Sequence, residues 1–130
     1  MNIKDNIKKL ITQAAKTQSI NELIDINQRI AGGLVYLAEL ETSAYRGYLE
    51  AEYARKSFEA RFVKDSQESA AKAVKLAEVE ASVLRECEYQ MEAEYKELQI
   101  FRMTAIEYIQ SIRQKISWAK HEKDIAQEAN

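Results

Sequence analysis

An unbroken seven-residue repeat of apolar residues in the second half of the chain is the feature that most constrains its fold. The repeat comprises Ala70, Ala77, Leu84, Met91, Leu98, Ala105, Ile112 and Ala119. A sustained repeat of this period keeps one face of an α-helix apolar and predicts left-handed supercoiling against another helix. Pro is absent from the 130 residues and Gly occurs only three times, so helix breakers are rare. We predict one helix over residues 67–124, about 85 Å long given the helical rise per residue.

A second apolar repeat predicts another long helix over residues 20–62. Its members are Leu23, Ile30, Leu37, Ala44, Ala51 and Phe58. Ser19 followed by Glu22 fits a capping box at the start of this helix. The adjacent Gly32 and Gly33 inside the repeat are compatible with a hinge or with close packing of another helix. We favour close packing.

The remaining segments complete the predicted fold. Apolar residues at helical spacing predict a short amphipathic helix over residues 2–16. The polar segment VKDSQES separates the two long helices, and Asp65 or Ser66 is expected to cap the third helix. Two long helices joined by a short turn form an antiparallel hairpin. The predicted fold is all-α: a single domain over residues 1–130, with a long antiparallel, coiled-coil-like helical hairpin, a short N-terminal helix folded back on it, and a tail over residues 125–130.

Large apolar residues are sparse, so one chain builds only a thin core, and we predict a homo-oligomer. The expected assembly surface lies near the end of the third helix and consists of Ile109, Ile112, Ile116 and Trp118. The stretch SIRQKISWAKHEKD, residues 111–124, also holds the only Trp and the only His, together with Arg113, Lys115, Lys120 and Lys123. Trp118 can anchor an oligomer contact, a contact with the first helix, or a contact with nucleic acid or another partner. We favour the oligomer contact.

The inventory of reactive side chains argues against an enzyme. One His and one Cys do not by themselves supply a nucleophile, a base and an orienting group. No metal-binding pattern surrounds His121 and no second Cys accompanies Cys87, so we predict no metal site and no cofactor. Glu pairs such as Glu86 and Glu88 point to different helix faces and indicate a solvated acidic surface.

Nothing in the sequence indicates a membrane protein. No apolar run approaches the ~20 residues that a membrane span needs. The N-terminal segment lacks the apolar region of a signal peptide. We therefore expect a cytoplasmic protein without membrane contacts.

Basic residues gather on both sides of the turn between the long helices, although the net charge is -2. They are Arg55, Lys56, Arg61, Lys64, Lys72 and Lys75. In an antiparallel hairpin these side chains converge at one tip, and a ring of protomers would multiply their contacts with phosphates. Phe58 and Phe62 lie among them, and proteins that bind single strands combine cations with stacking rings. Both Phe also fit the apolar repeat, so packing inside the hairpin is the simpler interpretation. Tyr45 and Tyr48 beside Arg46 raise the same choice.

Two stretches resemble the phage recombination mediator UvsY family, which is small and helical with a hairpin of long helices. One is ARKSFEARFVKDS, residues 54–66, and the other is IQSIRQKISWAKHEKD, residues 109–124, which is similar to the family's C-terminal oligomerisation helix. The two stretches span the second half of the chain. The resemblance implies a ring-like homo-oligomer that binds single-stranded DNA and helps a recombinase displace a single-strand-binding protein.

The resemblance also bears on single residues. The family's DNA-binding run is Lys-Ala-Arg, and the matching positions here are Glu59, Ala60 and Arg61. Arg61 carries over, whereas Glu59 reverses a charge. DNA contact would then depend on Arg61 together with Arg55, Lys56 and Lys64.

Two functions follow as hypotheses. The leading one is a non-enzymatic, oligomeric single-stranded-DNA-binding accessory protein of phage recombination or replication, acting in the host cytoplasm with a recombinase and a single-strand-binding protein. The alternative is a protein-only coiled-coil adaptor, scaffold or inhibitor that binds no nucleic acid. A metal-binding helical-bundle enzyme is a third possibility that we do not favour.

Overall fold

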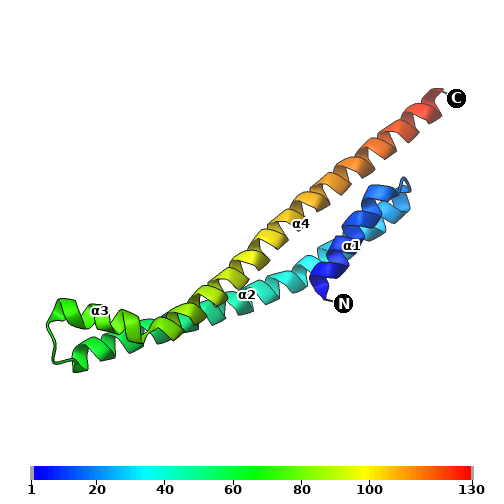
Figure 1. Ribbon diagram of the computed structural model, residues 1–130. Coiled ribbons are helices and arrows are strands. Elements are labelled where there is room, and N and C mark those ends of the chain that lie inside the picture. The colour runs from blue at the N-terminus through cyan, green and yellow to red at the C-terminus, as the bar shows by residue number, and fades with distance from the viewer. Residues whose placement is uncertain (1, 130) are drawn as a thin grey trace. The chain divides into compact units, whose positions relative to one another are not determined.

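The computed structural model describes residues 2–129, which fold into four α-helices (Figure 1). They are α1 (Ile3–Lys16), α2 (Ile20–Asp65), α3 (Ala70–Glu80) and α4 (Ser82–Ala129). The predicted all-α class is confirmed, and no strand occurs within residues 2–129. The first and last residues of the predicted domain, Met1 and Asn130, lie outside the described residues. No helix in residues 2–129 is long and apolar enough to cross a membrane.

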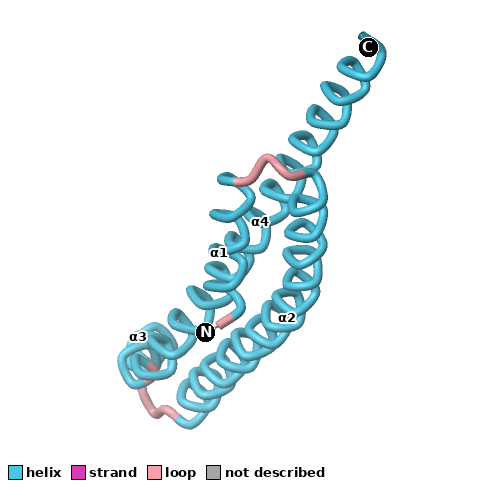
Figure 2. Tube along the Cα trace, turned by 90° about the vertical axis from the view of Figure 1, so that its right-hand side faces the viewer, coloured by secondary structure: helices cyan, strands magenta, loops and turns pink. Residues whose placement is uncertain are grey.

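A short loop, residues 17–19, joins α1 to α2, and its side chains fix the start of α2 (Figure 2). The hydroxyl of Ser19 accepts the backbone N–H of Glu22 (3.3 Å), which confirms one half of the predicted capping box. The carboxylate of Glu22 accepts from the hydroxyl of Thr17 (2.7 Å), and this hydroxyl oxygen accepts the N–H of Ser19 (3.2 Å). In a standard capping box the Glu22 carboxylate would accept the N–H of Ser19 directly, whereas here the hydroxyl of Thr17 links these two groups.

The connection between α2 and α3 differs from the prediction. α2 continues to Asp65 and does not end at residue 62, and neither Asp65 nor Ser66 caps the next helix. Ser69 is the N-cap of α3 and makes no side-chain capping bond. The hydroxyl of Ser66 accepts the N–H of Glu68 (3.2 Å), so it stabilises a local turn. α3 begins after this turn, at Ala70, and not at the predicted residue 67.

The predicted helix over residues 67–124 is interrupted at Ala81, which separates α3 from α4. The backbone of Ala81 (φ -87°, ψ 8°) lies in the bridge region outside the α-helical well. Helical hydrogen bonds continue on both sides of it at 2.9 Å, so the interruption is one residue long. α4 then extends to Ala129, and the predicted tail is helical over residues 125–129.

The chain divides into two compact units. Residues 1–39 together with residues 99–130 form unit 1, and residues 40–98 form unit 2. α2 and α4 each contribute to both units as continuous helices. The single domain over residues 1–130 stays a prediction.

In unit 1, α1 packs against α2 at a glycine. A Cβ atom at Gly33 would lie 3.0 Å from Cδ1 of Ile7, so the two helices approach closely only because no side chain intervenes. The predicted close packing is confirmed at Gly33. The buried side chains of this core are Ile7, Ala14, Leu23, Ile26, Ile30, Leu37, Ala105, Ile109 and Ile112.

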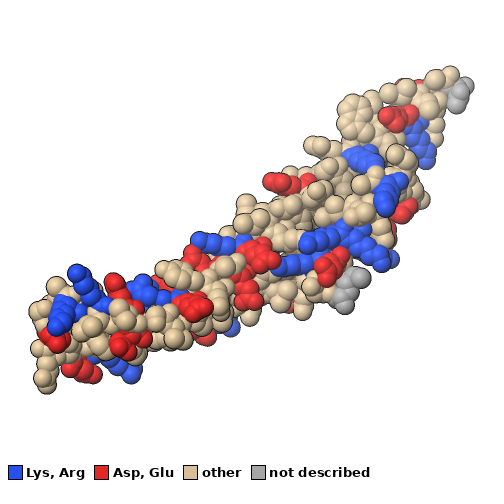
Figure 3. Space-filling view, in the orientation of Figure 1, with Lys and Arg blue, Asp and Glu red and all other residues tan. Residues whose placement is uncertain are grey.

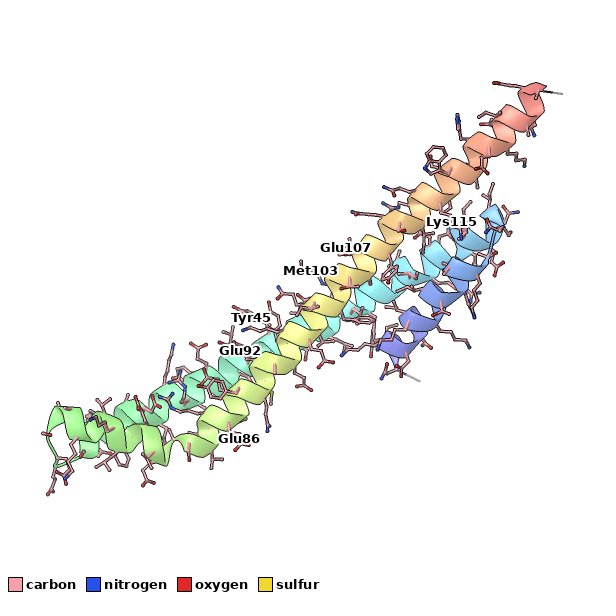
Figure 4. All side chains as sticks on the ribbon, turned by 45° about the horizontal axis from the view of Figure 1, so that its top comes forward. Tyr45, Glu86, Glu92, Met103, Glu107 and Lys115 are labelled. Atoms are coloured by element: carbon pink, nitrogen blue, oxygen red, sulfur yellow. The ribbon has the colours of Figure 1, made fainter. Side chains whose placement is uncertain are left out.

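α4 holds the other end of α1 in unit 1. The ammonium group of Lys115 donates to the carbonyl oxygens of Ala14 and Thr17, at 3.0 and 2.9 Å (Figure 4). These carbonyls lie at the C-terminal end of α1, where the helix dipole favours a cation. The N-terminal helix is therefore docked at its end as well as at Gly33.

In unit 2, α2 runs in the opposite direction to α4, because residue numbers rise along one helix as they fall along the other. The contacting pairs are Tyr45 with Tyr95, Arg55 with Glu88, and Glu59 with Arg85. Three small residues are buried at Ala73, Ala77 and Ala81. Ala70, predicted as an interior position of the repeat, is exposed. The assignment was wrong there because the buried alanines recur every four residues. That the two long helices pair along their full lengths, and that the protein forms a homo-oligomer, remain predictions.

Candidate nucleic-acid interface

The six predicted nucleic-acid-binding cations all lie in unit 2, on the last turns of α2 and on α3. We call this end of unit 2, residues 55–75, the tip. On the face seen in Figure 3, basic and acidic side chains alternate there. Ion pairs divide the six cations. Arg55, Lys56 and Lys72 have carboxylate partners, whereas Arg61, Lys64 and Lys75 are exposed and have no such partner within residues 2–129.

Arg55 belongs to a four-residue charge cluster between α2 and α4. Its guanidinium donates to Glu88 and, at 3.1 Å, to Glu59. Arg85 donates to the second oxygen of Glu59 at 2.8–3.0 Å. The hydrogen bond to Glu88 is the main cause that raises the pKa of Arg55, and the charges of Glu88 and Glu59 act in the same direction. The Arg55 side chain is only 16% exposed, so it is committed to this cluster and not to an external ligand.

Glu59, which the sequence places among the cations of the tip, takes part in the charge cluster between α2 and α4. Its side chain is 19% exposed and lies between Arg55 and Arg85. Two guanidinium groups therefore balance its charge. Glu59 reverses the sign of one position relative to the resembling family, but its carboxylate is turned toward α4 and not toward the free cations of the tip.

Lys56 and Lys72 make exposed pairs along their own helices. Lys56 pairs with Glu52 (2.5 Å) and Lys72 with Glu68 (3.4 Å), each four residues earlier. Such pairs contribute only ~0.3–0.5 kcal/mol and exchange readily for another anion. These two lysines can therefore still contact a phosphate, at the small cost of losing a surface pair.

The rings of Phe58 and Phe62 form a stacked pair at the tip. Their centroids are 6.2 Å apart and their planes differ by 29°. With Arg61, Asp65 and Ser66 they line an open pocket of about 460 Å³. Phe58 is 38% exposed, so packing inside the hairpin does not account for the whole surface of this ring. A ring face next to a free guanidinium is the arrangement that stacks bases and holds the backbone of single strands.

The free cations continue from this pocket along the helix surface. Arg61 and Lys64 are three residues apart on α2, which makes their side chains neighbours. Lys75 follows on α3, one turn after Lys72. The structure therefore brings together Arg61 and the two Phe rings, with Lys64 about one turn along α2 from Arg61. Arg55 is separated from them by its internal pairs.

Tyr45 and Tyr48 serve packing. The ring of Tyr45 lies 5.0 Å from that of Tyr95 on α4 and 6.4 Å from that of Tyr48. Burial raises the pKa of Tyr48, and the charge of Glu92 acts in the same direction. The three rings form a contact between α2 and α4 inside unit 2.

The four predicted assembly residues separate into two groups in unit 1. Ile109 and Ile112 are buried in the core of their own chain, and Ile116 is half-buried. Trp118 is 66% exposed, and the partner of its ring is His121 at 6.2 Å. The Trp ring therefore does not anchor α1, and of the four residues it has the largest free surface.

Several basic residues of unit 1 make contacts within the unit. Lys4 and Lys8 of α1 place their ammonium groups 6.0 and 5.8 Å from the ring centroid of Phe101, within range of a cation–π contact. Lys115 caps α1, as described above. These cations have structural roles, so unit 1 is the weaker candidate for a nucleic-acid surface.

Arg85 and Glu88 were not recognised from the sequence as partners of Arg55 and Glu59. A signal was present, because an antiparallel pairing keeps the sum of paired residue numbers nearly constant. Tyr45 with Tyr95 gives 140, Arg55 with Glu88 gives 143, and Glu59 with Arg85 gives 144. Opposite charges at such positions indicate a cross-helix pair once the register is known.

Comparisons of the chain with protein-family models, curated proteins and solved structures found no match.

Proposed function

We propose that this protein is a non-enzymatic, oligomeric single-stranded-DNA-binding accessory protein of phage recombination or replication, similar to recombination mediators. The observation that carries the proposal is the stacked pair of the exposed Phe58 and the half-buried Phe62 beside the unpaired Arg61. In this proposal the protein works in the host cytoplasm, and its long helices form an antiparallel hairpin that presents the tip to the strand.

Phosphates and bases are held by different groups. Arg61, Lys64 and Lys75 contact phosphates, with Lys56 and Lys72 available after exchange of their surface pairs. A base stacks on Phe58, for which ~1–3 kcal/mol is the usual value. One tip makes few contacts, so useful affinity requires several tips on one strand, which an oligomer supplies. A recombinase and a single-strand-binding protein are the expected protein partners.

The decisive experiment is a titration of labelled oligo-dT by fluorescence anisotropy at several salt concentrations, with duplex DNA as control. The double variant Arg61→Glu with Lys64→Glu should weaken binding strongly. It should also reduce the slope of log affinity against log salt, by about 0.7 for each phosphate that the variant no longer neutralises.

A matched control carries the same change in net charge away from the tip. Arg46→Glu with Lys96→Glu alters two exposed cations of unit 2, of which Lys96 makes a surface pair with Glu92, and should bind nearly as the parent protein does. Equal binding by the tip variant and the control variant would remove the tip from the proposal.

A protein-only adaptor is the second candidate function. It is favoured by exposed apolar side chains that no part of the chain covers within residues 2–129, such as Val79, Val83 and Trp118. The titration also separates the two functions, because an adaptor shows no oligo-dT binding even at low salt.

A further inference from the structure

A groove between α1 and α2 in unit 1 has no role in the proposed DNA contact. Its volume is about 510 Å³. Ile3, Ile7 and Leu10 of α1 and Gly32 and Gly33 of α2 line it, together with the polar side chains of Asn6, Gln13 and Tyr36 and the cations Lys9 and Arg29. The groove thus combines apolar and polar groups with two basic side chains.

The two glycines of the groove differ in what surrounds them. A Cβ atom at Gly33 would press on Ile7, which explains that glycine. A Cβ atom at Gly32 would meet nothing within 4 Å. Gly inside a helix is less favourable than Ala, and the chain's own packing does not require it at position 32. A stretch of helix without a side chain allows another helix to approach the backbone closely.

α4 carries a face with the complementary chemistry. Its exposed apolar residues are Ile100, Met103, Trp118 and Ile125, and its acidic residues are Glu107, Glu122 and Glu128. Ile100 and Trp118 are separated by about five helical turns and Trp118 and Ile125 by about two, so these side chains share one face. We call this set the outer face of α4. Figure 4 shows Met103 and Glu107 on the side of α4 away from α1.

The basic residues of the same segment point elsewhere. Lys115 caps α1, and Lys120 and Lys123 line a separate cleft with the start of α2. Residues 120–129 are helical although every one of them is exposed. A helical segment this short gains little stability by itself in water and usually depends on packing. The outer face of α4 is therefore apolar and acidic, and its last turns pack on nothing in the described chain.

We propose that the outer face of α4 of one copy docks in the α1–α2 groove of a second copy. Trp118 and Ile125 cover the backbone at Gly32, and Glu122 and Glu128 meet Lys9 and Arg29. Arg29 pairs with Asp25 (3.1 Å) on the exposed surface of α2, and such a pair exchanges readily. The two partner surfaces are different, so the contact is head-to-tail and generates a ring or a filament. This inference deepens the oligomeric part of the proposed function.

The size of the contact sets the expected strength. The groove can be no longer than α1, whose 14 residues span about 21 Å, and the docked helix is about 10 Å wide, which gives roughly 200 Å² on each partner. Stable interfaces bury ~800 Å² per partner. We therefore expect assembly that dissociates on dilution through the micromolar range.

Sedimentation velocity of the full chain without DNA, from low to high micromolar concentration, tests the inference. Gly32→Leu places a large side chain in the groove at a position where a Cβ atom meets nothing within 4 Å, so the variant should be as heat-stable as the parent and assemble roughly tenfold more weakly or worse. Ala31→Leu adds similar bulk one residue away, outside the groove, and should assemble as the parent does.

A charge exchange tests the pairing itself. Lys9→Glu with Arg29→Glu, and separately Glu122→Lys with Glu128→Lys, should each abolish assembly. An equimolar mixture of the two double variants should restore it, because each groove then meets an α4 of opposite charge. A parent chain that stays monomeric, a Gly32→Leu chain that assembles normally, or a mixture without rescue would overturn the inference. None of these outcomes depends on DNA, so they leave the test of Arg61 and Lys64 independent.

Discussion

At the scale of single residues, Glu59 shows why a charge cannot be assigned to a surface from its place in the sequence. Two residues before Arg61 in the chain, it is an acid in a basic stretch. In the structure its two oxygens accept from Arg55 and Arg85, and Glu88 completes the cluster. A partly buried carboxylate between two guanidinium groups is a structural element. Replacing it leaves Arg55 with Glu88 alone and takes from Arg85 its nearest carboxylate.

We therefore predict that Glu59→Gln lowers the free energy of unfolding by about 1–3 kcal/mol, because two guanidinium groups lose a charged acceptor. Binding to oligo-dT should be unchanged, since Arg61 and Lys64 keep their surroundings. Chemical denaturation followed by circular dichroism measures the first quantity. Glu68→Gln, which removes the partner of the exposed Lys72, is the control and should change stability by less than about 0.5 kcal/mol. A loss of stability in the control equal to that of Glu59→Gln would contradict the assigned role of the cluster.

At the scale of helices, the apolar repeat predicted the existence and order of the helices better than their ends. The all-helical class, the start of α2 at Ile20 and the close packing at Gly33 follow from spacing, capping residues and glycine. The interruption at Ala81 could not be predicted, because neither Gly nor Pro marks it and alanine favours a helix. The same applies to the burial of Arg55, which depends on which residue of α4 lies opposite it.

α3 offers a direct test of the packing register. The seven-residue repeat makes Ala70 an interior residue and leaves Ala73 out, whereas the structure leaves Ala70 exposed and buries Ala73. We predict that Ala73→Leu destabilises the protein by about 1–3 kcal/mol, because added methyl groups overfill a closely packed contact. Ala70→Leu should change stability by less than about 0.5 kcal/mol. Thermal denaturation of the two variants distinguishes the registers, and destabilisation by Ala70→Leu but not by Ala73→Leu would restore the seven-residue register.

At the scale of the whole molecule, the residues proposed for DNA binding and those proposed for assembly belong to different units. Phe58, Arg61 and Lys64 are in unit 2. Lys9, Gly32 and the outer face of α4 are in unit 1. A variant in one unit should therefore change one property and leave the other measurable. Assembly affects DNA binding only through avidity, because an assembly places several tips on one strand.

This separation predicts how strand length controls affinity. On an oligo-dT short enough for one tip, Gly32→Leu and the parent chain should bind equally well, since each uses the same few contacts. On a long oligo-dT the parent should bind more tightly by at least about 100-fold, the lower end of the gain expected from linked sites. Arg61→Glu with Lys64→Glu should assemble as the parent does and bind neither strand well. Anisotropy titrations with the two strand lengths, above the concentration at which the parent assembles, give all three comparisons. If Gly32→Leu loses affinity on the short strand as well, the groove contacts DNA directly, and assembly and strand binding share one surface.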